Sequence, residues 1–207
     1  MPKHIYFCNS KGGCGKTMLA TQTAAYFAVN GHSVALADHD RQRSALDWLR
    51  QRPSGCAGIA PVAAYRKEDA PEAMDVVVHD LPGSVEIEQL HDVSSDGGHL
   101  LLPLLSSPTD LMAGVRFLMA LNAENWVEER LKVGIVANRV RHNTRYNEVL
   151  MSFLDNINRP LVGTLRDTQN YIRASQAGVS VFDLPPSRVR RDLEQWQPIL
   201  DWLSTPA

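Results

Sequence analysis

A glycine-rich segment, Lys11-Gly12-Gly13-Cys14-Gly15-Lys16-Thr17, most constrains what this chain can fold into. An apolar run over residues 4–8 precedes the segment, and a helix-like run over residues 18–30 follows it. A strand, a glycine loop and a helix in that order form a cradle for phosphate, because the loop curls around an anion and the helix points its first N–H groups at it.

The residue types in this loop predict ATP and Mg²⁺ as cofactors. Gly15 allows close approach of the backbone, Lys16 can neutralise the β- and γ-phosphates, and Thr17 can place its hydroxyl on Mg²⁺. The alternative is a glycine-rich turn without a ligand, which the order of strand, loop and helix disfavours. The predicted nucleotide-binding residues are Lys11, Gly12, Gly13, Cys14, Gly15, Lys16, Thr17, Met18 and Asn138.

Strand-like and helix-like runs alternate along the whole chain. Helices are expected at residues 18–30 and 44–51, and strands at residues 4–8, 34–37, 76–79, 101–105, 133–137, 161–165 and 179–182. Continuous apolar strands between helices are typical of a parallel sheet that is buried on both faces. The sequence therefore predicts an α/β fold, with a doubly wound, mostly parallel sheet flanked by helices, and a single domain over residues 1–207.

Acidic residues follow two of these strands, where ligands bind in such sheets. Asp38 and Asp40 follow the run 34–37, and Asp80 follows the run 76–79. Asp80 has the position of an acid that holds Mg²⁺ directly or through water. Asp38 and Asp40 occupy alternate positions, so they are expected to have different roles, and a helix-capping role is the alternative for one of them.

Two further strand ends offer weaker indications. Asn138 follows the strand at residues 133–137 and could read an adenine ring or cap the next turn. The segment 106–110 follows the strand at residues 101–105 and could be a loop with a helix cap at Thr109.

With the additional lysine, Lys11, the loop resembles the deviant Walker A motif, K-G-G-x-G-K-[ST], of the ParA/MinD family of dimerising ATPases. The resemblance implies that Lys11 reaches the nucleotide of a partner subunit. It also implies that Asp40 orients the attacking water, that Asp38 supports the magnesium shell and that Pro82 and Gly83 switch with hydrolysis. In this resemblance the catalytic residues are Lys11, Lys16 and Asp40, and the metal residues are Thr17, Asp38 and Asp80.

Other segments extend the resemblance over nearly the whole chain. The run 106–110 is similar to a P-x-P-x segment near the nucleotide and the dimer interface, and the run 174–183 to an A-x-x-G-x-x-x-x-D stretch with Gly178 and Asp183. The size of the chain resembles the short, ParF-like partition branch. The nitrogenase iron-protein branch requires cluster cysteines, and the three cysteines here fit structural thiols instead.

Arginines are concentrated in the last third of the chain. Residues 139–191 contain nine arginines, no lysine and four acids, a balance of +5 against −7 for the rest of a chain whose net charge is −2. Arginine suits bidentate contacts to phosphate, although a solvated helix surface or ion pairs would give the same composition. The candidate DNA-binding residues are Arg166, Arg173, Arg188, Arg190 and Arg191.

The resemblance thus implies an ATPase with slow basal turnover that forms an ATP-dependent homodimer, binds DNA without sequence preference and positions a cargo. The cargo would be a plasmid, a chromosome or a protein assembly such as a carboxysome, and a ParB-like protein or cargo adaptor would stimulate hydrolysis. The alternatives are a metabolic enzyme of the dethiobiotin-synthetase type and a MinD-like membrane-cycling ATPase. The acidic residues in the C-terminal segment disfavour a membrane anchor, and we expect a cytoplasmic, nucleoid-associated protein.

Overall fold

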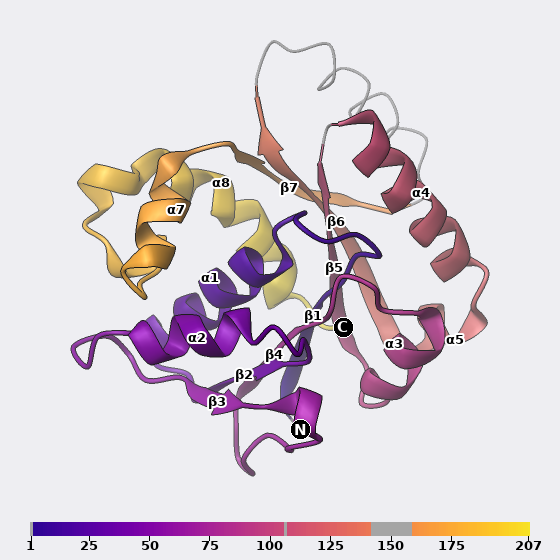
Figure 1. The fold of residues 1–207 in the computed structure, drawn as a ribbon, viewed down its shortest axis with the longest axis horizontal. Coiled ribbons are helices and arrows are strands. Elements are labelled where there is room, and N and C mark those ends of the chain that lie inside the picture. The colour runs from indigo at the N-terminus through magenta and orange to yellow at the C-terminus, as the bar shows by residue number, and fades with distance from the viewer. Residues whose placement is uncertain (1, 106, 142–158) are drawn as a thin grey trace.

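The computed structural model describes residues 2–105, 107–141 and 159–207. Within these ranges seven strands form one sheet in the order β3-β2-β4-β1-β5-β6-β7 (Figure 1). Every neighbouring pair of strands is parallel, so the predicted fold class is confirmed. The strands are β1 (Lys3–Phe7), β2 (Val34–Asp38), β3 (Ala60–Val62), β4 (Val76–Asp80), β5 (Gly98–Leu105), β6 (Leu131–Val140) and β7 (Leu161–Arg166).

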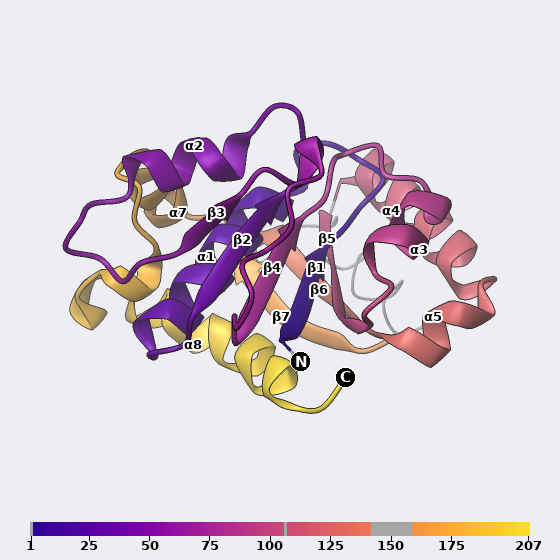
Figure 2. The ribbon, with the colours of Figure 1, turned by 90° about the horizontal axis from the view of Figure 1, so that it is seen from below.

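Helices cover both faces of the sheet (Figures 1 and 2). One face packs against α1 (Lys16–Val29), α2 (Ser44–Gln51), α7 (Gln169–Gln176) and α8 (Pro186–Ser204). The other face packs against α3 (Ile87–Val93), α4 (Pro108–Asn122) and α5 (Asn125–Arg130). Short 3₁₀ turns complete the fold at η1 (Ala64–Arg66) and η2 (Val181–Asp183).

The central strand β1 shows why apolar runs without alternation predicted this architecture. Ile5 and Phe7 contribute to the core under α1, whereas Tyr6 and Cys8 contribute to the core under α3 and α4. All four residues are fully buried. Because successive side chains of a strand point to opposite faces, both faces of β1 must be apolar.

One sequence-based expectation needs correction, and one strand was not expected. The predicted strand at residues 179–182 is wrong, because this segment leads into the 3₁₀ turn η2. The edge strand β3 was not predicted, since it has only three residues and the second is Pro61.

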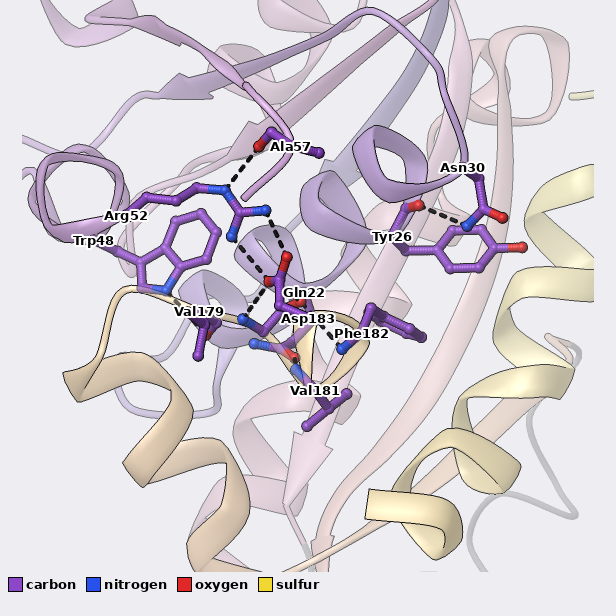
Figure 3. A network of polar contacts seen from close by, with 11 residues as sticks. Gln22, Tyr26, Asn30, Trp48, Arg52, Ala57, Val179, Val181, Phe182 and Asp183 are labelled. Carbon is purple, nitrogen blue, oxygen red and sulfur yellow. Dashed lines mark hydrogen bonds and ion pairs between the residues drawn. The ribbon is translucent and has the colours of Figure 1, made fainter. Parts of the chain in front are cut away.

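The segment around Gly178 and Asp183 has a structural role that its sequence alone does not explain. Asp183 accepts hydrogen bonds from both terminal nitrogens of Arg52, each at 2.9 Å, and this ion pair is buried (Figure 3). Gly178 has a φ of +66°, and a Cβ there would lie 2.4 Å from the backbone of Gln51. The contacts fasten the connection between α7 and α8 to the end of α2.

Candidate functional site

The phosphate loop follows β1 at the carboxyl edge of the sheet and leads into α1. Gly13 and Gly15 have φ values of +80° and +100°, which favour glycine. The N-cap residue of α1 is Gly15, which has no side chain to cap the helix, and the first turn contains no acid. The first N–H groups of α1 are therefore available to an anion.

Lys16 is buried and folds back over its own loop. Its Nζ donates to the carbonyl oxygen of Lys11 at 3.2 Å, and only 7% of the residue is exposed. A phosphate in the loop would offer this ammonium group a charged acceptor in place of a neutral carbonyl.

Asn138 supports the loop from the end of β6. Its Nδ2 donates to the carbonyl oxygen of Cys14 at 2.8 Å, and its Oδ1 accepts from the N–H of Arg139 at 2.9 Å. A Cβ at Gly15 would lie 2.2 Å from the same Nδ2. Because β6 continues to Val140, Asn138 does not cap a following turn. It joins β6 to the phosphate loop instead, and its contact with adenine stays a prediction.

Thr17 and Asp80 lie together beneath the loop, as their predicted roles require. The Thr17 hydroxyl donates to Oδ2 of Asp80 at 2.6 Å. Oδ1 of Asp80 is buried and has no hydrogen-bond partner among the described residues. Burial raises the pKa of Asp80 to about 7, against the lowering effect of the bond from Thr17.

The donor set at Asp80 fits magnesium. Mg²⁺ prefers oxygen ligands and usually keeps several waters beside one or two protein groups. A buried carboxylate oxygen without a donor, next to a hydroxyl and a phosphate loop, supplies such ligands. A bound cation would also favour the ionised form of Asp80.

The two aspartates after β2 differ in environment, as their alternate positions predicted. The carboxylate of Asp38 is fully buried and accepts from the backbone N–H groups of Asp40, Ala45 and Leu46 at 3.0–3.2 Å. Asp38 therefore caps the start of α2, and its magnesium role stays a prediction. Asp40 is half-buried, with Oδ1 accepting from the N–H of Gln42 at 2.9 Å.

In the loop after β4, Gly83 lies close to the backbone of the phosphate loop. A Cβ built on Gly83 would lie 3.1 Å from both N and Cα of Gly12. Glycine is thus the residue that fits at this contact, where the switch role of Pro82 and Gly83 is predicted.

Lys11, at the mouth of the loop, forms an ion pair with Asp110 in the first turn of α4. Ser107 caps α4 by accepting from the N–H of Asp110 at 3.3 Å, so the predicted cap at Thr109 is wrong. Burial acts to raise the pKa of Asp110, but hydrogen bonds from Lys11 and Ser107 outweigh it and hold that pKa below its ordinary value. Ser106, the first residue of this segment, lies outside the described residues.

A cavity of about 870 Å³ opens beside the phosphate loop. Besides Gly15, Met18 and Asn138, it is lined by residues that follow β7, and sequence reasoning missed these: Asp167, Thr168, Gln169, Tyr171 and Ile172. The rule that ligands bind at strand ends could have found them, because β7 ends at Arg166.

Arg166 belongs to this cavity and not to the outer surface of α8. Its Nε donates to the buried carboxylate of Asp192 at 2.7 Å. The other four candidate DNA-binding arginines are exposed on α7 and α8. Arg190 is paired with Glu194 at 2.9 Å. Arg145, which contributed to the charge count, lies outside the described residues.

The parallel sheet, the glycine loop and the buried lysine define a P-loop nucleotide-binding protein of the α/β class. Residues 5–181 match the family described as the CobQ/CobB/MinD/ParA nucleotide binding domain, and the chain belongs to this family.

Individual relatives are more distant. The chain is 27% identical, over 184 residues and 85% of both chains, to the maintenance of carboxysome distribution protein A of Halothiobacillus neapolitanus. Its fold is similar to the Mg-ADP complex of the septum site-determining protein MinD from Pyrococcus horikoshii (TM-score 0.73, 14% identity, 99% of this chain and 97% of that one). It is also similar to the Cyanothece McdA(D38A)–ATP complex (TM-score 0.71, 13% identity, 100% and 98%).

Three further observations concern metal ligands, thiols and membrane spans. The described residues contain no group of three or more His, Cys, Asp or Glu side chains that could hold a metal ion among themselves. Cys8, Cys14 and Cys56 are free thiols. Among the helices within residues 2–105, 107–141 and 159–207, none is long and apolar enough to cross a membrane.

Proposed function

We propose that the protein is an ATPase that dimerises when it binds ATP and uses this cycle to position a cargo. The observation that carries the proposal is the pairing of two lysines at one phosphate loop, Lys16 buried inside it and Lys11 partly exposed at its mouth. One triphosphate held by Lys16 leaves Lys11 available to a second subunit.

The residues around the loop would share the work of hydrolysis. Lys16 and the first N–H groups of α1 hold the phosphates, and Thr17 and Asp80 hold Mg²⁺, which neutralises charge that develops on the phosphate oxygens. Asp40 orients the attacking water. Gly83 lies against the backbone of Gly12 in the phosphate loop. Its loop would therefore change position when the γ-phosphate is lost.

Non-specific DNA is the proposed track for the dimer. Arg173, Arg188 and Arg191 are exposed, and no ion pair involves them among the described residues. Arginines of this kind make phosphate contacts that tolerate any sequence and weaken with salt. The cargo would be a protein assembly or a plasmid, and an adaptor or ParB-like partner would stimulate hydrolysis; the relative in H. neapolitanus is named for carboxysome distribution.

Binding of random duplex DNA, measured by fluorescence anisotropy with ATP, ADP or no nucleotide across a salt series, tests the proposal. We expect binding with ATP alone and none for Lys16→Ala. The double variant Arg188→Ala/Arg191→Ala removes four arginines from the dimer, so it should weaken binding and lower the salt slope by up to about four. Arg116→Ala, an exposed arginine on α4 across the sheet, is the matched control and should bind normally.

Absence of DNA binding in every nucleotide state would contradict the DNA-coupled cycle. It would favour the metabolic or membrane-cycling alternatives, which screens of carboxylate substrates and of anionic vesicles would then separate.

A further inference from the structure

Lys11 forms an ion pair with Asp110 of its own subunit. In the proposed cycle the same lysine side chain has to reach the nucleotide of the partner subunit. Asp110 uses both carboxylate oxygens locally: Oδ1 accepts from Lys11 Nζ and Oδ2 from the Ser107 hydroxyl. The side chain of Asp110 is 18% exposed and that of Lys11 is 41% exposed. The lysine is therefore held at the mouth of the loop and is still within reach of solvent.

The position of Asp110 on α4 favours this arrangement. Asp110 lies in the first turn of a 15-residue helix, where the helix dipole stabilises a negative charge. The hydroxyl of Ser107 also donates to the carboxylate, so Asp110 is held in place by a contact that does not depend on Lys11. A carboxylate in that place attracts the ammonium group of Lys11.

The backbone of Lys11 is also restrained. Its N–H donates to Oδ1 of Asn9 at 3.3 Å, and Asn9 is anchored to the carbonyl of Pro103 at 2.7 Å. Its carbonyl accepts from Lys16 Nζ. A phosphate that draws Lys16 away removes the last of these restraints and so links nucleotide binding to Lys11.

We propose that Asp110 is a positioning residue that holds Lys11 against its own subunit and competes with the partner's nucleotide for it. The inference rests on the proposed function, because it assigns Asp110 to the same dimerisation step. A triphosphate, with more negative charge than one carboxylate, wins the competition. Without it, Lys11 stays paired and the subunits stay apart.

A purely structural role makes the opposite prediction. If the pair only secured the start of α4, its loss would loosen the region beside the nucleotide and weaken dimerisation. If Asp110 competes for Lys11, its loss should strengthen dimerisation. The sign of the effect therefore distinguishes the two roles.

Sedimentation over a range of protein concentrations, with AMPPNP and Mg²⁺, measures whether loss of the Asp110 charge strengthens or weakens dimerisation. Asp110→Asn should dimerise at about tenfold lower concentration, since an ion pair of this exposure changes an equilibrium about two- to fivefold and a dimer contains two of them. Asp110→Glu, which keeps the charge, should return toward wild type. Asp47→Asn, which removes the exposed pair with Arg50, is the matched control and should not change dimerisation.

Labelling of Lys11 with an amine-reactive acylating reagent, quantified on peptides by mass spectrometry, tests the pair without nucleotide. Lys11 should react several-fold faster in Asp110→Asn than in wild type, while Lys132 serves as the internal reference. Equal labelling of Lys11 in Asp110→Asn and wild type, or weaker dimerisation of a folded Asp110→Asn, would overturn the inference. If the wild-type protein still dimerises with AMPPNP, the proposed function is unaffected by that result. A wild-type protein that stays monomeric with AMPPNP would refute the proposed function itself.

Discussion

Asp80 presents a buried carboxylate oxygen to a space in which the described chain supplies no donor. A buried acceptor without a partner destabilises a fold by about 1–3 kcal/mol. Such a group is kept where a ligand satisfies it, which here would be magnesium together with the nucleotide. The unpaired oxygen of Asp80 therefore lowers the stability of the nucleotide-free protein, and binding of magnesium and nucleotide would restore that stability.

Asp80→Asn tests this at the scale of one residue. The variant lacks the buried charge, so we expect the nucleotide-free protein to melt about 2–4 °C higher, equivalent to about 1 kcal/mol. Its additional stabilisation by ATP with Mg²⁺ should disappear. Differential scanning calorimetry with and without ATP and Mg²⁺ measures both effects.

Asp38→Asn is the matched control, because Asp38 is buried but satisfied by three N–H groups. It should lower the melting temperature, with a cost of about 1–3 kcal/mol. A full shift with ATP and Mg²⁺ in Asp80→Asn would argue against a metal role for Asp80.

Sequence reasoning at this scale found the residues whose partners are near in the sequence or follow a motif. Thr17 and Asp80 were placed together because both follow strands of a phosphate-binding sheet. Asp110 was not assigned a role, because its contact with Lys11 spans 99 residues and depends on how α4 packs. The capping role of Asp38 was one of two open alternatives, and the turn after β2 shows that role, whereas the magnesium role of Asp38 stays a prediction.

Between elements, the buried pair of Arg52 and Asp183 fastens α2 to the turn η2. Burial acts to raise the pKa of Asp183, but hydrogen bonds from Arg52 and Ser180 outweigh it and lower the folded-state pKa. The carboxylate therefore stabilises the fold above its unfolded pKa of about 4, and this stabilisation is lost as pH falls through the folded-state pKa.

Asp183→Asn should consequently lower the free energy of unfolding by about 3–5 kcal/mol at pH 7, because it leaves the Arg52 charge buried without its counter-charge. The difference from wild type should shrink below pH 4. Thermal unfolding followed by circular dichroism at pH 7 and pH 3 checks the effect. Asp47→Asn, which breaks an exposed pair, is the control and should lower the free energy of unfolding by less than about 1 kcal/mol at either pH. If Asp183→Asn lowers the free energy of unfolding equally at pH 7 and pH 3, the role of its charge is contradicted.

Element by element, strands with continuous apolar runs were predictable and short or irregular ones were not. Residues 179–182 are apolar except for Ser180, but they do not extend as a strand. The left-handed Gly178 and the capping bond that the Phe182 N–H donates to Ser180 Oγ turn the chain instead. β3 follows a loop and contains Pro61, so its sequence has no strand signal. Tertiary contacts decide both cases.

For the whole molecule, alternation of strands and helices predicted the class of fold, whereas the strand order came only from the structure. β1 lies between β4 and β5 at the centre of the sheet, so the phosphate loop has helices of both layers beside it. This placement brings Lys11 to α4 and Asn138 to Gly15, two contacts that no local pattern encodes.

Lys11→Ala is the test of the dimer at this scale. The variant should still bind ATP, because Lys16, Thr17 and the N-terminus of α1 remain, but it should fail to dimerise since the cross-subunit charge is gone. Light scattering with ATP and Mg²⁺ measures the mass, and fluorescence of a labelled ATP measures binding. Persistence of the ATP dimer would rule out the role of Lys11 across the interface.

The contact between Gly83 and Gly12 has a further consequence for how the protein can be studied. Neither residue has a side chain, so this contact is made by main-chain atoms that every variant retains. A survey that shortens side chains one at a time would record both positions as silent. Only a substitution that adds side-chain atoms, and so pushes the two loops apart, can reveal the effect of this contact.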